Sequence, residues 1–224
     1  MKHDEAFMKP KYNLPRGYLS YSAVKLWLTS KAQYRKRYYE NEKPFETVET
    51  NFGHKIHEIM EDPKKIVKYP ALMKIPRYSV SEFEIIVDVD GVPVKGRIDS
   101  YEPTTGSFND TKSGHRNKDG KAPWDAVRVR KDMQLPWYSF LIKHATGKVD
   151  KTCYLIWIET SFKRKTIEFD GHELSNESRE LELTGAIEVF KRNIAQWERD
   201  RIRKLIGKVA KEISRDYTEY LKSK

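Results

Sequence analysis

The hydrophobic positions of this chain follow a helical period near its start and a strand period farther on. Apolar and aromatic side chains recur at helical spacing over residues 22–40, with Ser22 as a suitable N-cap, and again over 47–61. From Val80 onward, apolar and polar positions alternate, which is typical of a half-buried strand. Asp90 and Gly91 then supply the residues that a two-residue hairpin turn requires. The pattern therefore predicts two helices followed by a β-hairpin.

The second half of the chain predicts further strands and two long helices. A third strand is expected near residues 108–112, and a helix over about 125–144. Two more strands are expected over 153–159 and 165–169. From Ser175 to the end, apolar residues keep a helical spacing among mostly charged positions, which predicts a long amphipathic helix.

Composition narrows the possible classes of protein. The chain has 224 residues with 43 Lys and Arg against 33 Asp and Glu, a net charge of +10 that favours nucleic acid or an anionic membrane as partner. Its longest apolar run, 153–158, is far shorter than the roughly 20 residues of a membrane span. No apolar signal region opens the chain, so we expect a cytoplasmic protein that is not inserted in a membrane. The single cysteine, Cys153, excludes an internal disulfide and is expected to be a small buried hydrophobe.

Two acidic residues and a lysine carry the clearest chemical signal. Gly96-Arg-Ile-Asp99 is followed by Asp110-Thr-Lys112 on the next predicted strand. Carboxylates suit hard divalent cations such as Mg²⁺, and Asp110 and Lys112 share one face of their strand. The lysine can therefore orient or deprotonate an attacking water, or neutralise charge on a phosphoryl group. Taken alone, the same residues are equally well explained as turn-flanking carboxylates and a solvated lysine.

The flanking residues favour the first reading, because the sequence resembles the PD-(D/E)xK nuclease superfamily in its RecB-like branch. Five short motifs occur in the family's order across about residues 20–138. They are Leu19-Ser-Tyr-Ser22 followed by Leu26, Gly53-His-Lys-Ile-His57, Gly96-x-x-Asp99, Asp110-x-Lys112 and Gln134-x-x-x-Tyr138.

The resemblance implies a site for Mg²⁺ or Mn²⁺. Asp99 and Asp110 would bind the metal, with the main-chain carbonyl of Thr111 and the imidazole of His57 as further ligands, and Lys112 would be the catalytic lysine. Without the family, His57 would be read as a half-buried helical histidine.

Two more pairs of residues are assigned through the same resemblance. Gln134 and Tyr138 would border the catalytic site, although a surface glutamine and a core tyrosine would fit the same spacing. The family often has an assisting glutamate near Glu82 or Glu84, and the sequence does not choose between them. Many RecB-like nucleases also hold an iron–sulfur cluster on four cysteines. With Cys153 alone, we expect no cluster and a compact stand-alone nuclease.

Basic and aromatic residues after Lys112 predict a DNA-binding surface. The alternative is a solvated basic loop, and Tyr34, Tyr38 and Tyr39 are expected in the core rather than against bases. The predicted DNA contacts are Ser22, His115, Arg116, Lys118, Trp124, Arg128, Arg130 and Lys131.

Together these features predict an α/β (α+β) PD-(D/E)xK core, with a mixed central sheet flanked by helices and a basic helical appendage. The expected segments are an N-terminal arm (1–19), a nuclease core (20–173) and a C-terminal helical extension packed on the core (174–224). The predicted function is a metal-dependent deoxyribonuclease acting on DNA ends, with a recombination or single-strand annealing protein as a further partner. The alternatives are a non-catalytic DNA-binding module, a structure-specific or single-strand endonuclease, and a membrane-surface or protein-interaction protein.

Overall fold

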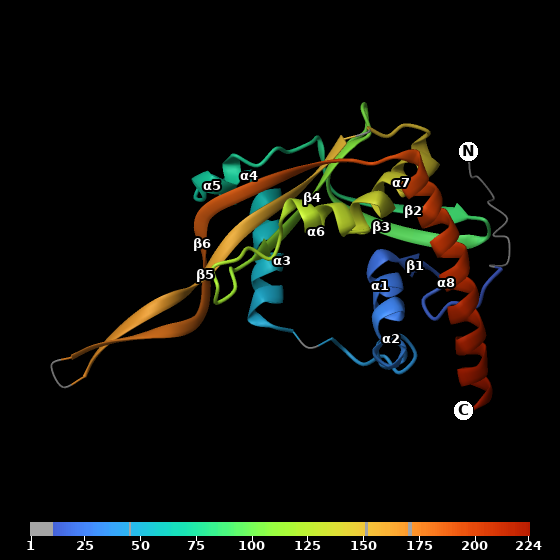
Figure 1. The fold of residues 1–224 in the computed structure, drawn as a ribbon, viewed down its shortest axis with the longest axis horizontal. Helices are drawn as coiled ribbons and strands as arrows, with labels where there is room; N and C mark the ends of the chain where they lie inside the picture. The colour runs from blue at the N-terminus through green and yellow to red at the C-terminus, as the bar shows by residue number, and fades with distance from the viewer. Residues whose placement is uncertain (1–10, 45, 151, 170–171) are drawn as a thin grey trace.

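Residues 11–44, 46–150, 152–169 and 172–224 are described by a computed structural model, in which helices cover both faces of one mixed sheet (Figure 1). The sheet order is β1-β3-β4-β5-β6, and β2 pairs with β3. β4 and β5 run parallel, whereas β2–β3, β3–β4 and β5–β6 are antiparallel. The strands are β1 (Leu19–Ser20), β2 (Val80–Val89), β3 (Val92–Glu102), β4 (Ser107–Gly114), β5 (Thr152–Phe169) and β6 (His172–Asn193).

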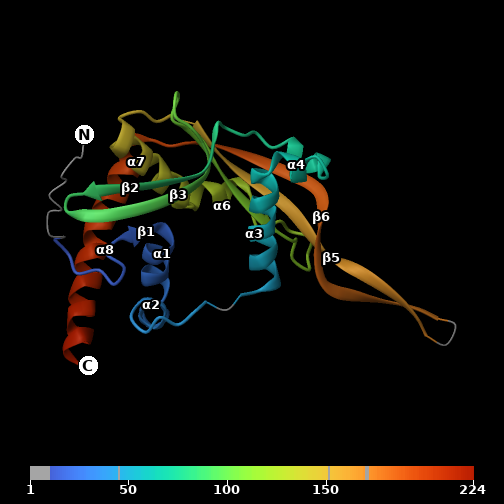
Figure 2. The same ribbon diagram turned by 180° about the vertical axis from the view of Figure 1, so that it is seen from behind.

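The helices gather at two ends of the sheet. Viewed from behind, α1, α2, α7 and α8 lie at one end, and α3 and α4 lie at the other (Figure 2). The helices are α1 (Tyr21–Thr29), α2 (Lys31–Tyr38), α3 (Val48–Glu61), α4 (Pro63–Ile66), α5 (Pro70–Met73), α6 (Ala126–Lys131), α7 (Gln134–Thr146) and α8 (Gln196–Lys222).

The first part of β5 is buried on both faces, and its alternate side chains belong to two different cores. Leu155 and Trp157 pack in the larger core with residues of α1, α7 and α8. Ile156 and Ile158 pack in a second core with residues of α3, α4 and α5. A strand covered on both faces reads as a continuous apolar run, which explains the sequence over 153–158. Cys153 is buried in the larger core, as expected.

Of the three helices predicted before residue 145, the one over 47–61 is the single helix α3, and the other two are each divided in two. Ser20, rather than Ser22, caps α1, and Ser30 interrupts the helix and caps α2 through the N–H of Gln33. The helix expected over 125–144 ends at Lys131 and restarts at Gln134. In each case a short polar side chain competes for backbone N–H groups and favours a new helix start.

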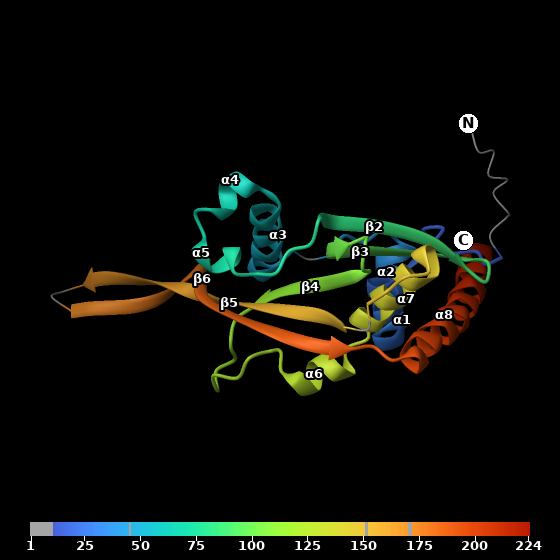
Figure 3. The same ribbon diagram turned by 90° about the horizontal axis from the view of Figure 1, so that it is seen from above.

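The helix expected from Ser175 is wrong over residues 175–193, because this segment belongs to β6. β6 pairs with β5 from Thr152 and Asn193 to Phe169 and His172, and the two predicted strands of 153–169 are one strand. The hairpin runs beyond the helices (Figure 3). The boundary predicted between 173 and 174 therefore falls within a hairpin, and the helical extension is α8 alone. The apolar spacing that suggested a helix also fits period two, since Leu183 and Ile187 both pack on the second core.

The described part of the N-terminal arm is anchored. Residues 1–10 lie outside the described residues, whereas Leu14 is buried and the N–H of Asn13 donates to Ser214 Oγ at 2.9 Å. No helix within the described ranges has the length and apolar character needed to cross a bilayer.

A glycine substitution tests how closely the turn between β3 and β4, the strands that carry the predicted acids, is packed. Gly106 has φ of 75°, and a Cβ there would lie 2.7 Å from the main-chain Cα of Val149. Gly120 has φ of 72° but would meet nothing within 4 Å. Both Gly→Ala changes strain the backbone, and Gly106→Ala adds a clash with main chain. We expect Gly106→Ala to lower the melting temperature clearly more than Gly120→Ala in thermal unfolding followed by circular dichroism. Equal losses would contradict the close packing of this turn.

Candidate active site

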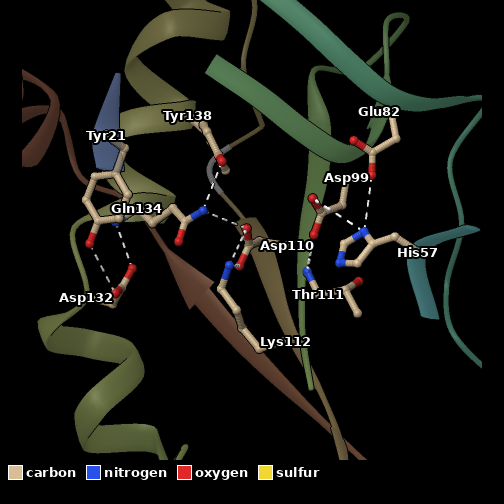
Figure 4. Close-up of polar contacts among 10 residues, drawn as sticks. All are labelled: Tyr21, His57, Glu82, Asp99, Asp110, Thr111, Lys112, Asp132, Gln134 and Tyr138. Atoms are coloured by element: carbon tan, nitrogen blue, oxygen red, sulfur yellow. Dashed lines mark hydrogen bonds and ion pairs between the residues drawn. The ribbon is translucent and has the colours of Figure 1, made fainter. Parts of the chain in front are cut away.

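The site forms where β3 and β4 separate. Among the described pairs, these strands are joined only from Ser100 and Asn109 to the turn. Asp99 precedes this region on β3, and its Oδ2 accepts the N–H of Thr111 at 2.6 Å (Figure 4). The carboxylate thus satisfies a main-chain donor of β4 at the point where β3 no longer pairs with it.

His57 approaches Asp99 from α3. A Cβ on Gly53 would lie 3.3 Å from Ser113 Oγ of β4, so glycine allows this helix to approach the sheet closely. His57 Nδ1 lies 3.1 Å from Glu82 Oε1 and 4.0 Å from Asp99 Oδ1. The helix, β2 and β3 therefore each contribute one polar side chain to the same point (Figure 4).

The sequence does not decide which of Glu82 and Glu84 assists the metal site, but the two residues have different surroundings. Glu82 has φ of 50°. In the described register of β2 and β3, the residues on either side are paired, whereas Glu82 and Asp99 are not. The Glu82 carboxylate contacts His57 and Arg97. Glu84 is exposed and pairs with Lys95 at 2.7 Å. Glu82 is therefore the glutamate that faces the candidate site.

Asp110 occupies the other half of the site. Lys112 Nζ lies 3.1 Å from Asp110 Oδ1 and 2.8 Å from Oδ2. From α7, Gln134 Nε2 donates to Asp110 Oδ1 at 3.0 Å and to the hydroxyl of Tyr138 at 2.9 Å. The four residues that the motifs place near one another thus form one connected polar group (Figure 4).

Positive charges of the protein offset the negative charge of the buried carboxylates only in part. Burial, then the charge of Asp110, raises the pKa of Asp99 to about 7, despite opposing effects of His57 and Lys112. Burial likewise raises the pKa of Asp110. Burial acts to lower the pKa of Lys112, but Asp110 and Asp99 outweigh it and the net shift is upward. The hydrogen bond to Glu82 raises the pKa of His57. A cation placed here would relieve this excess of buried negative charge.

Three side chains fit a divalent cation. Ligand atoms of His57, Glu82 and Asp99 all lie within 4.8 Å of one another, beside a pocket of about 400 Å³. Carboxylate oxygens with one imidazole suit Mg²⁺ or Mn²⁺. Asp110 lies outside this group of three, and its buried Oδ2 is in contact with the Lys112 ammonium group. Its role as a ligand, and that of the Thr111 carbonyl, stay predictions.

The predicted DNA contacts do not form one surface of free cations. Arg116 pairs with Glu159 and Glu188, each at 3.2 Å, and lies over the Trp157 ring. Arg128 lies over the half-buried ring of Trp124. The other predicted contacts are exposed, namely Ser22, His115, Lys118, Arg130 and Lys131. Tyr34, Tyr38 and Tyr39 are core residues, as expected.

Asp132 is a neighbour of the site that the motifs do not include. Its Oδ1 accepts the N–H of Gln134 at 2.7 Å, and its Oδ2 accepts from the Tyr21 hydroxyl at 3.4 Å. It fixes the start of α7 and thus the position of the Gln134 side chain. The only sequence signal is an aspartate two residues before the helix, whose short side chain can accept a main-chain N–H two residues further along.

Similarity to known proteins comes from structure alone. No protein-family model and no curated protein matches the sequence. A candidate exonuclease from Eubacterium rectale shares the fold, with a TM-score of 0.58 at 12% identity over 91% of this chain and 82% of that chain. The expected architecture, a mixed central sheet flanked by helices, is thereby confirmed as the fold.

Two other solved structures are more distant. A phage-related exonuclease from Haemophilus somnus 129PT has a TM-score of 0.48 at 14% identity, over 90% of this chain and 82% of that one. An alkaline exonuclease from Laribacter hongkongensis has a TM-score of 0.42 at 12% identity, over 92% of each chain.

The raised pKa of Asp99 predicts a pH dependence for metal binding. A carboxyl group must lose its proton to bind a cation, so Asp99 alone is expected to lower the affinity for Mn²⁺ by up to about tenfold per pH unit as the pH drops below about 7. His57 adds to this trend, because its raised pKa also keeps it protonated to higher pH. Isothermal titration calorimetry on either side of pH 7 measures the change. An affinity that does not vary with pH across this range would contradict it.

Proposed function

We propose that this chain, which has the PD-(D/E)xK nuclease fold, is a metal-dependent deoxyribonuclease that hydrolyses phosphodiester bonds. The proposal rests on one observation: two sets of polar residues meet where β3 and β4 separate. One group is a set of cation ligands from α3, β2 and β3. The other is the buried pair of Asp110 and Lys112. A site that only bound DNA would gain nothing from buried carboxylates beside phosphate groups.

The side chains divide the chemistry between them. His57, Glu82 and Asp99 would hold Mg²⁺ or Mn²⁺, which when bound polarises phosphate and lowers the pKa of water. The ion pair with Asp110 holds Lys112 as an ammonium group, which can donate to a phosphoryl oxygen and offset its developing charge. Gln134 orients the Asp110 carboxylate, and Tyr138 orients Gln134 in turn.

The finer proposal is exonucleolytic action on DNA ends during recombination, repair or phage DNA metabolism. The shared fold with a candidate exonuclease supports the exonucleolytic mode, and the order of the motifs supports the RecB-like branch. A recombination or single-strand annealing protein as partner remains part of this proposal and rests on the family resemblance alone.

Cleavage of end-labelled DNA tests the function. Wild-type protein is expected to degrade single- or double-stranded DNA with Mg²⁺ or Mn²⁺ and to be inactive in EDTA. Asp110→Asn removes the charge that holds Lys112, and Glu82→Gln removes a candidate metal ligand. Each is expected to lower the cleavage rate by about 100-fold or more. The order in which labelled products appear distinguishes removal of terminal nucleotides from internal cuts.

Glu84→Gln is the matched control for Glu82→Gln. It makes the same chemical change two residues away on β2, at an exposed position paired with Lys95. Its activity should stay close to that of the wild type. Equal losses in the two variants would remove Glu82 from the site, and absence of cleavage by the wild type with either metal would overturn the proposed function.

A further inference from the structure

Trp197, in the first turn of α8, has a surface position that its packing does not explain. Its side chain is 64% exposed, the largest exposure among the large hydrophobic residues of the described chain. Trp27, Trp137 and Trp157 are by contrast fully buried. Trp197 lines a pocket of about 350 Å³ between the end of α6 and the start of α8. Arg130, Lys131 and Arg201 line the same pocket.

A buried arginine fixes the geometry of this pocket. Arg192 of β6 donates to the main-chain carbonyls of Val129 and Asp132 at the end of α6, and it pairs with Glu198 at 2.6 Å in the first turn of α8. Its side chain is 7% exposed. The ion pair neutralises Glu198, so the cations facing the pocket are left in excess. The contacts hold the main chain at the end of α6, which carries Lys131, beside the start of α8.

From Trp197 a row of cations continues along the outer face of α8. Its members follow one another at steps of three and four residues, which places them on one side of a helix over about 21 Å. They are Arg201, Lys204, Lys208, Lys211 and Arg215. All five are exposed, and this face lies opposite the buried one formed by Ile202, Ile206 and Ile213. We call this row the α8 cation stripe.

The stripe residues differ from the neighbouring cations in forming no ion pair within the described ranges, although the charge of Lys208 helps to lower the pKa of Glu212. Arg203, on another face of α8, pairs with Asp90, and Lys31 and Arg35 of α2 pair with Glu212 and Asp216. None of the five stripe residues forms an ion pair with another residue in the described ranges. A row of exposed cations that form no ion pairs is typical of a surface that binds a polyanion.

We propose that the pocket and the α8 cation stripe bind a single strand of DNA. An unpaired base would stack on Trp197, with phosphates held by Arg130, Lys131 and Arg201 and then by the stripe. The inference rests on the proposed function and adds the path of one strand. Asp132 and Met133 line the pocket and directly precede Gln134, which contacts Asp110. The pocket therefore adjoins the catalytic group.

An anionic membrane fits this surface less well than DNA does. A helix that lies on a bilayer inserts an apolar face. The apolar face of α8 is occupied by the core, and Trp197 is the one hydrophobic residue aligned with the stripe.

Binding of a labelled oligodeoxythymidine in EDTA, where cleavage is not expected, tests the proposal. Trp197→Ala should weaken binding by about 5- to 150-fold, and Trp197→Phe, which keeps an aromatic face, much less. Arg201→Gln should lower the slope of log affinity against log salt concentration by about 0.7. Bound oligonucleotide should quench tryptophan fluorescence, and Trp197→Phe should lose most of that quenching.

Arg203→Gln is the matched control, since it removes a cation of α8 that is already paired. It should leave affinity and salt slope nearly unchanged. If the wild type cleaves DNA but Trp197→Ala and Arg201→Gln bind the oligonucleotide as it does, the strand path is wrong and the nuclease proposal stands. If the wild type neither binds nor cleaves DNA, or binds phosphatidylserine vesicles in place of DNA, both are overturned.

Discussion

The arrangement of this protein depends on two carboxylates that the fold buries beside each other without enough positive charge. Asp99 and Asp110 stand on adjacent strands at the point where those strands part, and both have raised pKa values. Lys112 and His57 compensate them only in part. Such a cluster is unfavourable in a protein that binds no cation, and it becomes favourable when a divalent cation joins it. The excess of buried negative charge therefore governs both the stability of the site and the cation binding on which its proposed chemistry depends.

The sheet makes this convergence possible because both of its faces are covered. α3 packs on one side, with the core that contains Ile156, and brings His57 toward Asp99. α7 packs on the other side, with the core that contains Leu155, and brings Gln134 to Asp110. Side chains from opposite faces can meet only at an opening in the sheet. The separation of β3 from β4 provides it.

Contacts within each motif could be predicted because the residues lie two to four positions apart in the sequence, whereas the candidate site as a whole joins residues between His57 and Tyr138. The spacing within Asp110-x-Lys112 and from Gly53 to His57 follows from strand and helix periods, and the structure groups these residues as expected. The choice between Glu82 and Glu84 depended on a backbone angle at Glu82 that no pattern reveals. The strand over 172–193 was missed because Leu183 and Ile187 fit either period. Pairing with β5, a non-local contact, decides between them.

Thermal unfolding of wild type and Asp99→Asn well above pH 7 tests the central claim most directly. The asparagine can still accept the Thr111 N–H but carries no charge, so without metal the variant should melt higher, by about 2–4 °C per kcal/mol of repulsion relieved. Mn²⁺ should raise the melting temperature of the wild type and leave that of the variant almost unchanged. A variant that melts lower than the wild type without metal, or equal stabilisation of both by Mn²⁺, would contradict the account.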